Sequence, residues 1–183
     1  QILFFDLTFL PVIEAIASRV KTVRAFVAMT DRAHMPQGSK VANLICYEDL
    51  ISQSSDVFEW PILDENSACT LCYTSGTTGN PKGALYSHRS TVLHAYGSAL
   101  PDGLNLSARD TVLPVVPLFH VNAWGLPYAC ALTGAKLVMP GPQLDGPSLH
   151  ELFEAEKVTV SAGVPTIWLG LLQHLQAKGL RLS

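Results

Sequence analysis

Short apolar runs alternate with stretches of helical periodicity along most of the chain. Residues 2–5 and 23–29 are apolar runs of strand length. Between them, residues 11–20 have helical spacing that places four apolar side chains on one face, namely Val12, Ile13, Ile16 and Val20. The order of strand, helix and strand predicts a βαβ unit and therefore a parallel sheet. Residues 31–66 are polar, which predicts a long surface excursion with one short helix near residues 47–51.

The alternation resumes after the polar stretch. Strands are predicted at residues 68–73, 112–116, 136–139 and 158–161, and helices at 87–100, 121–132, a segment ending at Glu156, and 165–178. Ser148 and Glu151 have capping-box spacing, Pro165 suits a first helical turn, and Gly179 is a natural stop. The predicted fold class is α/β, with mostly parallel sheets flanked by helices on both faces.

The chain contains few charged residues for its length. Charged residues make up 15% of the 183 residues, where a globular domain carries roughly 25%, and 48% are hydrophobic. A net charge of −3 argues against a nucleic-acid partner. The shortage of charge indicates that part of the surface is covered, either in an oligomer or in a larger protein. Because Gln1 is not an initiator residue, we favour a slice of a larger protein.

The uncharged run between Asp110 and Lys136 is long enough to span a bilayer at roughly 20 residues. Its prolines Pro114, Pro117 and Pro127 are incompatible with one apolar helix, so no transmembrane segment is predicted there. No cationic segment precedes an apolar one at the start, so no signal peptide is recognised.

The cysteines offer a second candidate chemistry. Cys69 and Cys72 form a C-x-x-C pair, which fits redox or zinc chemistry, but no second pair follows at zinc spacing. Residues 68–73 read as a buried strand, in which positions three apart point to opposite faces. We therefore interpret the four cysteines as free core thiols in a reducing compartment.

One segment is unusually rich in phosphate-binding chemistry. Residues 73–83 read YTSGTTGNPKG and directly follow a predicted strand. Glycines allow close backbone approach, hydroxyls add donors, and Lys82 is the only charged residue between Glu65 and Arg89. This combination predicts a polyphosphate site, with a turn between two strands as the structural alternative.

Two common sites are excluded by the spacing. A Walker A loop needs a hydroxyl after its lysine and a helix starting there, whereas Gly83 follows Lys82 and residues 84–86 look extended, with the helix delayed to about Ser87. A G-x-S-x-G elbow is absent from the sequence, which argues against a serine esterase of the α/β-hydrolase type.

The loop resembles the phosphate-binding signature of the adenylate-forming, or AMP-binding, enzymes. Residues 115–125 (VVPLFHVNAWG) and 159–168 (TVSAGVPTIW) are similar to segments of medium- and long-chain fatty-acid CoA ligases. The resemblance implies two-step chemistry, in which a carboxylate and ATP give acyl-AMP and pyrophosphate, and coenzyme A then gives the thioester. It also implies that residues 1–183 are part of the large N-terminal domain, with residues 1–66 and 67–183 as two portions and the C-terminal domain absent.

The resemblance assigns roles by position. The β- and γ-phosphates of ATP would be held by six consecutive residues, Thr74, Ser75, Gly76, Thr77, Thr78 and Gly79. Lys82 would steady the loop or the leaving pyrophosphate, and Thr74 would also reach Mg²⁺. His120, Val121 and Trp124 would line the site, with Trp124 as a wall or gate of an acyl tunnel. From the residues alone, His120 fits a core histidine equally well. The remaining histidines considered, His88, His94, His150 and His174, are interpreted as structural or surface residues.

Several alternatives stay open at this level. The chain is expected to be inactive by itself, because the family's magnesium-binding acid and catalytic lysine have no counterpart here. A non-catalytic nucleotide-binding or interaction module is the alternative to a ligase. Among ligases, the sequence does not separate fatty acids from short branched or sulfur-containing acids. A homodimer of the full-length protein is left open, and a cytoplasmic location is expected.

Overall fold

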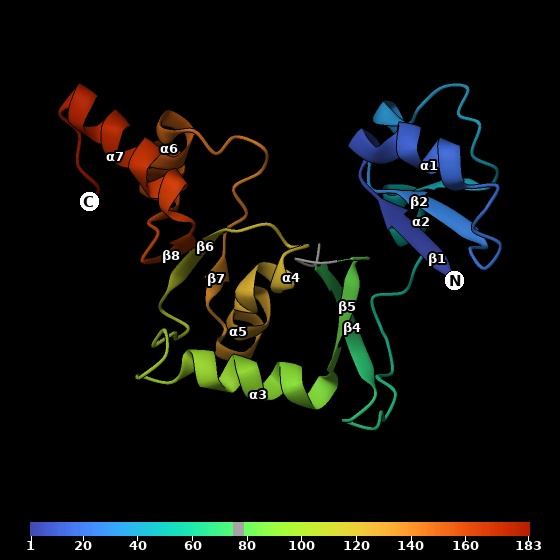
Figure 1. The fold of residues 1–183 in the computed structure, drawn as a ribbon, viewed down its shortest axis with the longest axis horizontal. Coiled ribbons are helices and arrows are strands. Elements are labelled where there is room, and N and C mark those ends of the chain that lie inside the picture. The colour runs from blue at the N-terminus through green and yellow to red at the C-terminus, as the bar shows by residue number, and fades with distance from the viewer. Residues whose placement is uncertain (75–78) are drawn as a thin grey trace. The chain divides into compact units, whose positions relative to one another are not determined.

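The computed structural model describes residues 1–74 and 79–183. The chain divides into two units, Gln1–Pro61 and Ile62–Ser183, which are described separately (Figure 1). The sequence predicts a division after residue 66, and the structural division falls after Pro61. No helix in the described residues has the length and hydropathy of a membrane span.

The first unit is a three-stranded parallel sheet with strand order β1-β2-β3. Strand β1 (Ile2–Phe5) is followed by a 3₁₀ turn at Leu7–Phe9 and by α1 (Leu10–Ile16), which leads to β2 (Ala25–Ala28). The predicted βαβ unit is therefore confirmed. A second 3₁₀ turn at Arg32–His34 precedes β3 (Leu44–Cys46), and α2 (Tyr47–Ser52) follows it. The sequence indicated α2 but missed β3, because three apolar residues inside a polar stretch are too few to show a period.

The core of the first unit forms where α1 covers the sheet. Its buried residues are Phe5, Ile13, Phe26, Ala28 and Val41. The prediction that Val12 shares the buried face was wrong, because its side chain is 55% exposed. Adjacent helical residues point about 100° apart, and the face that packs is centred on Ile13 and Ile16.

The second unit combines an antiparallel hairpin with a parallel sheet. The hairpin consists of β4 (Ala68–Thr74) and β5 (Lys82–Ser87), and α3 (His88–Ala99) follows it. The sheet has the order β7-β6-β8, from β6 (Thr111–Val115), β7 (Lys136–Leu137) and β8 (Val160–Gly163). The connecting helices are α4 (Val121–Trp124), α5 (Leu126–Thr133) and α6 (Gly146–Glu156), and α7 (Pro165–Lys178) follows β8. The predicted α/β class is confirmed, and the hairpin is the antiparallel exception.

Both faces of the parallel sheet are covered, as predicted. On one face Val112 packs with Leu126 and Cys130, so α5 lies against that side. On the other face Leu113 packs with Leu149 of α6 and Leu171 of α7. Successive residues of a strand point to opposite faces, which explains why neighbours in β6 belong to different cores.

Helix ends follow local chemistry. Pro165 opens α7, and Gly179 ends it with a φ of 64°, as the sequence predicts. The predicted capping box of Ser148 with Glu151 was wrong. The cap is Asp145, whose carboxylate accepts a hydrogen bond from the Ser148 backbone N–H at 3.0 Å, so Ser148 already lies inside α6. At α3 the cap is Ser87, which forms a reciprocal pair of hydrogen bonds with Ser90.

Candidate functional site: a hairpin loop and an apolar cavity

The predicted phosphate loop joins the two strands of the hairpin. Thr74 and Lys82 are directly opposite each other as the last pair of the β4–β5 ladder, and both are exposed. Gly79 has a φ of 91°, and apart from its chain neighbours no atom of the described residues lies within 4 Å of the place where a Cβ would be. Ser75, Gly76, Thr77 and Thr78 lie outside the described residues. The segment 75–81 is far longer than the two-residue connection that is commonest in hairpins.

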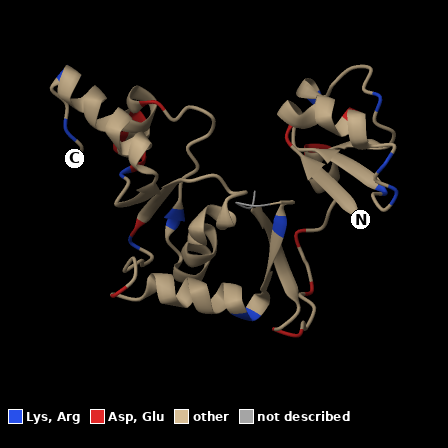
Figure 2. Ribbon diagram, viewed as in Figure 1, with Lys and Arg blue, Asp and Glu red and all other residues tan. Residues whose placement is uncertain are grey.

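A single positive charge lies at the end of the loop. Lys82 is the one Lys or Arg residue of the two hairpin strands (Figure 2). An ammonium group at the mouth of a glycine- and hydroxyl-containing loop attracts anions, and exposure leaves it free to reach one. The arrangement of Thr74, Gly79 and Lys82 is therefore suited to phosphate oxygens.

Strand β4 is less buried than its sequence predicted. Cys72 is its only buried residue, Cys69 is exposed, and Leu71 and Tyr73 are at least half exposed. The prediction of a buried strand was wrong because, within the described chain, other elements cover only one face of this hairpin.

The interpretation of the cysteines as free thiols is confirmed, although only three of them are buried. Burial raises the pKa of the Cys130 thiol, which keeps that group protonated and unreactive. The described residues contain no group of three or more His, Cys, Asp or Glu side chains that could hold a metal ion.

A left-handed turn follows β6. The predicted helix over residues 121–132 is confirmed only from Leu126 onward, as α5, and its first part was wrong, because the structure has the short turn α4 and then Gly125 there. Val121, Asn122, Ala123 and Trp124 have φ angles of 49°, 52°, 50° and 56°. A left-handed conformation costs roughly 1–2 kcal/mol for each residue other than glycine. Such strain persists only where the surroundings enforce it, and it concentrates at functional sites.

The turn packs against β4 and α3. Ala123 is fully buried, and the thiol of Cys72 donates to Oδ1 of Asn122 at 3.3 Å. Gly125 lies directly against α3, because a Cβ there would be 2.6 Å from Nδ1 of His94. A side chain at position 125 would therefore push α3 away from the turn.

A cavity of about 240 Å³ lies beside the turn. Aromatic rings, hydroxyl groups and the backbone of the turn line it: Tyr86, Ser90, Thr91, His94, Val121, Asn122, Trp124, Gly125 and Tyr128. None of these residues carries a carboxylate, ammonium or guanidinium group. An apolar cavity with a few polar groups is typical of a small-molecule site.

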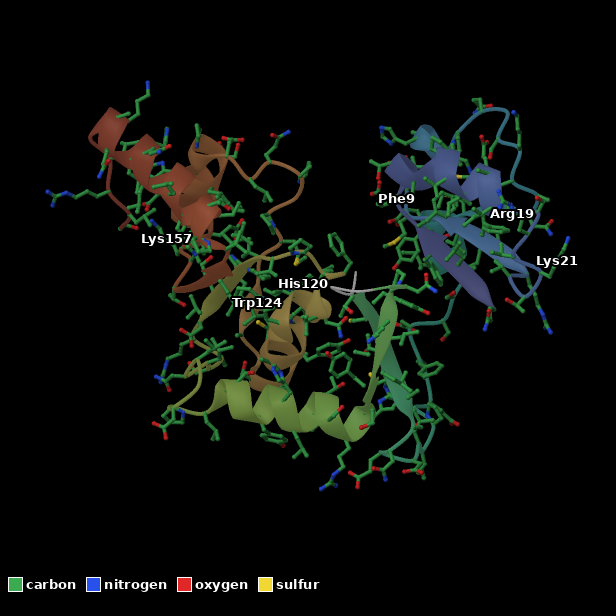
Figure 3. All side chains as sticks on the ribbon, viewed as in Figure 1. Phe9, Arg19, Lys21, His120, Trp124 and Lys157 are labelled. Atoms are coloured by element: carbon green, nitrogen blue, oxygen red, sulfur yellow. The ribbon has the colours of Figure 1, made fainter. Side chains whose placement is uncertain are left out.

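The cavity contains two of the three residues predicted to line the acyl site. Val121 and Trp124 form part of its wall, and Trp124 is 40% exposed. His120 is exposed and does not line the cavity, although it directly precedes the turn (Figure 3). The structure thus groups Val121 with Trp124 and leaves His120 at the entrance to the turn.

Sequence reasoning missed the contribution of α3. Ser90 and His94 are four residues apart, so they lie on the same helical face, and both line the cavity. His94 was interpreted as structural or surface. The spacing of Ser90 and His94 was the available signal, together with the apolar cluster around Trp124.

Thr74 and Lys82, which flank the hairpin loop, and the uncharged cavity lie in the same α/β unit. The chain matches the AMP-binding enzyme family over residues 12–183 and belongs to this family.

Among its relatives, it is 58% identical to the medium-chain-fatty-acid–CoA ligase of Ectopseudomonas oleovorans, over 98% of this chain and 33% of that protein. It is 53% identical to the 3-methylmercaptopropionyl-CoA ligase of Ruegeria pomeroyi, over 100% of this chain and 34% of that protein. The chain therefore spans about a third of the length of these relatives.

Solved structures support the fold. The anthranilate CoA ligase AuaEII in complex with anthranoyl-AMP superposes with a TM-score of 0.78 at 24% identity, covering 100% of this chain and 34% of that one. At this identity the likeness concerns the fold alone.

Proposed function

We propose that the complete protein carrying this chain is an ATP-dependent acyl-CoA ligase. In the first step a carboxylate oxygen bonds to the α-phosphorus of ATP, and the bond to pyrophosphate breaks. In the second step the thiol of coenzyme A attacks the acyl carbonyl, loses its proton, and releases AMP. Family membership and the similarity to acid–CoA ligases support this proposal.

The observation that carries the proposal is the pairing of Thr74 with Lys82 at the mouth of the loop. The Thr74 hydroxyl and the Lys82 ammonium group would contact phosphate oxygens from opposite strands. Ser75, Gly76, Thr77, Thr78 and Gly79 would supply further donors to the β- and γ-phosphates. Neutralising and orienting phosphate in this way is the main source of catalysis in phosphoryl chemistry.

The cavity beside the turn would receive the acyl chain. Val121 and Trp124 would form its wall, and His120 would lie near its entrance, between the chain and the nucleotide. A medium-length fatty acid is the substrate we propose, because the uncharged lining favours an apolar chain. The chain is about equally similar to a fatty-acid ligase and to a ligase for a short sulfur-containing acid. Short sulfur-containing acids are therefore the competing substrate class.

Mg²⁺ is part of the proposal. When bound, it would neutralise charge on the triphosphate. Mg²⁺ keeps several waters and takes few protein ligands beside phosphate, so a single hydroxyl oxygen from Thr74 fits its requirements. In the described residues no carboxylate cluster joins Thr74, so an acidic ligand would come from elsewhere in the complete protein.

The partners we propose are therefore ATP, a carboxylic acid and coenzyme A, and no nucleic acid. The free cysteines support a reducing compartment such as the cytoplasm. A homodimer of the complete protein is also proposed, because the small share of charged residues suits a chain with covered surface.

Exchange of labelled pyrophosphate into ATP tests the first step. With the complete protein and Mg²⁺, exchange should depend on added decanoate, and adding coenzyme A should give decanoyl-CoA. A series of acids from 3-methylmercaptopropionate to palmitate then ranks the substrates. Nucleotide binding without exchange for any acid would contradict the proposal and favour a non-catalytic module.

A further inference from the structure

Two histidines outside the candidate site meet where α6 and α7 pack together. His150 lies in the second turn of α6, and His174 lies near the end of α7. The centres of their rings are 5.9 Å apart, and the ring planes are tilted by 54°. Both residues are half-buried. The fold therefore brings together two imidazoles that are far apart in the sequence and that have no part in the proposed ligase site.

Close packing of the two helices fixes the position of this histidine pair. A Cβ at Gly146 would lie 2.6 Å from the Cβ of His174 and 2.8 Å from the backbone oxygen of Gly170, so α7 lies directly on the first turn of α6. Gly146 and His150 are four residues apart, as are Gly170 and His174, and residues at this spacing share a helical face. The two faces that meet therefore each carry an imidazole. The core shared by β6, α6 and α7 holds the helices in this arrangement.

The separation of the rings fits two imidazoles bound to one metal ion. A zinc–nitrogen bond places the ion about 3.2 Å from a ring centre, so the centres of two bound rings are at most roughly 6.4 Å apart. A tetrahedral angle at the ion brings the centres to about 5.2 Å. The observed 5.9 Å lies between these two values. A contact between two aromatic rings has the same range of distances and is the structural alternative.

The charges around the histidine pair favour a cation. Asp145 is near enough to His174 for their charges to interact, and Glu154 is near enough to His150. A carboxylate on either side offsets the charge of a divalent ion. The described residues offer no third His, Cys, Asp or Glu ligand at this place. Water would therefore complete the coordination, whereas structural zinc sites have four protein ligands.

We propose that His150 and His174 form a binding site for a divalent transition metal ion of the kind that imidazole suits, such as Zn²⁺ or Ni²⁺. Each neutral ring gives one nitrogen lone pair to the ion, and any proton on that nitrogen is released to solvent. The bound ion joins the beginning of α6 to the end of α7. This site is independent of the proposed function, because it shares no residue with the loop or the cavity.

Calorimetry with NiCl₂ tests the site on the complete protein, purified without a histidine tag and treated with a chelator beforehand. His150→Gln and His174→Gln each remove one ligand and retain a polar side chain. Each should weaken nickel binding at least about tenfold, since even an outer partner of a metal ligand is worth about 10–100-fold. The double variant should bind little more weakly than either single variant, because both rings act on the same ion. His88→Gln, which removes a histidine of α3, should leave the affinity unchanged.

Diffraction at the nickel absorption edge, on crystals of the nickel-loaded unmodified protein, locates the ion without any substitution. An anomalous peak at bonding distance from both rings is expected. A peak on one ring, no peak there, or unchanged affinity in both glutamine variants would overturn the proposal and leave the histidines as an aromatic contact. Pyrophosphate exchange with Mg²⁺ should be equal in the unmodified protein and the variants, so the metal site and the proposed function are judged by separate assays.

Discussion

Two regions of the second unit are built in opposite ways. In the sheet β7-β6-β8, the central strand β6 is buried on both faces, and Leu113 has no exposed surface. In the hairpin β4–β5, Cys72 is the one buried side chain of the described strands. The turn that lies against the hairpin is strained, whereas β6 is extended and regular.

The difference indicates that the parallel sheet stabilises the unit, whereas the hairpin carries the polar groups of the candidate site. Buried aliphatic side chains of β6, α6 and α7 stabilise the unit through apolar burial. The hairpin presents hydroxyls and one ammonium group to a loop, and these contribute little to packing. Substitutions in the two regions should therefore have separable effects.

Leu113→Ala should have the largest effect, and it should act on stability. Leu113 is fully buried between the sheet and its helices, so removing it leaves a cavity. The free energy of unfolding should fall by about 3 kcal/mol, measured by urea denaturation of the complete protein. A loss below about 1 kcal/mol would contradict the assignment of β6 as the stabilising region.

Lys82→Ala should lower activity and leave stability unchanged. Acyl-AMP formation should fall at least about tenfold, because loss of one charge contact to the transition state costs more than a kcal/mol. The midpoint of urea denaturation should stay unchanged, because Lys82 is exposed. Undiminished pyrophosphate release would remove Lys82 from the site. Lys136→Ala is the control for loss of an exposed strand lysine, although it also removes an ion pair with Glu156.

Trp124→Ala should change substrate preference more than rate. The indole forms part of the cavity wall, so its removal enlarges the space for an acyl chain. Relative kcat/KM should shift toward longer acids by about fivefold, since one methylene group in a hydrophobic pocket is worth at least about 1 kcal/mol. An unaltered ranking of acids from butyrate to palmitate would exclude Trp124 from the wall.

Asp110→Asn should have the smallest effect, confined to low pH. The carboxylate of Asp110 accepts three hydrogen bonds, from the backbone N–H and the hydroxyl of Ser107 and from the hydroxyl of Thr159. These hydrogen bonds hold the pKa of Asp110 below its ordinary value of 3.8. A lowered folded-state pKa contributes stability above pH 3.8, which is lost as pH falls through the folded-state pKa.

The stability difference between the unmodified protein and Asp110→Asn should therefore shrink as pH drops below 3.8. Denaturant midpoints measured from neutral pH downward provide the test. A difference that stays constant across this range would show that the charge of Asp110 contributes nothing.

The sequence predicted the regions of regular packing and the chemistry of the loop. The βαβ unit, the sheet around β6 and the ends of α7 follow from periodicity, Pro165 and Gly179, because these are local signals. The left-handed turn was missed because its cause is not local. The residues that lie against it, Cys72 and His94, are far away in the sequence.

The candidate site shows the same division. Thr74, Gly79 and Lys82 were predicted from one continuous motif, and Val121 and Trp124 from a second. The wall contributed by Ser90 and His94 was missed, because the packing of α3 against Gly125 brings it into place. Tyr86 and Tyr128 likewise enter the cavity only through tertiary packing.

Gly125 limits how the cavity of this protein can be reshaped. Elsewhere around the cavity, a larger or smaller side chain can replace an existing one, so substitution can narrow or widen the space in small steps. At Gly125 the backbone itself lies against the ring of His94, and no amino acid is smaller. The distance between the turn and α3 therefore cannot be tuned by substitution at this position without displacing one of the two elements.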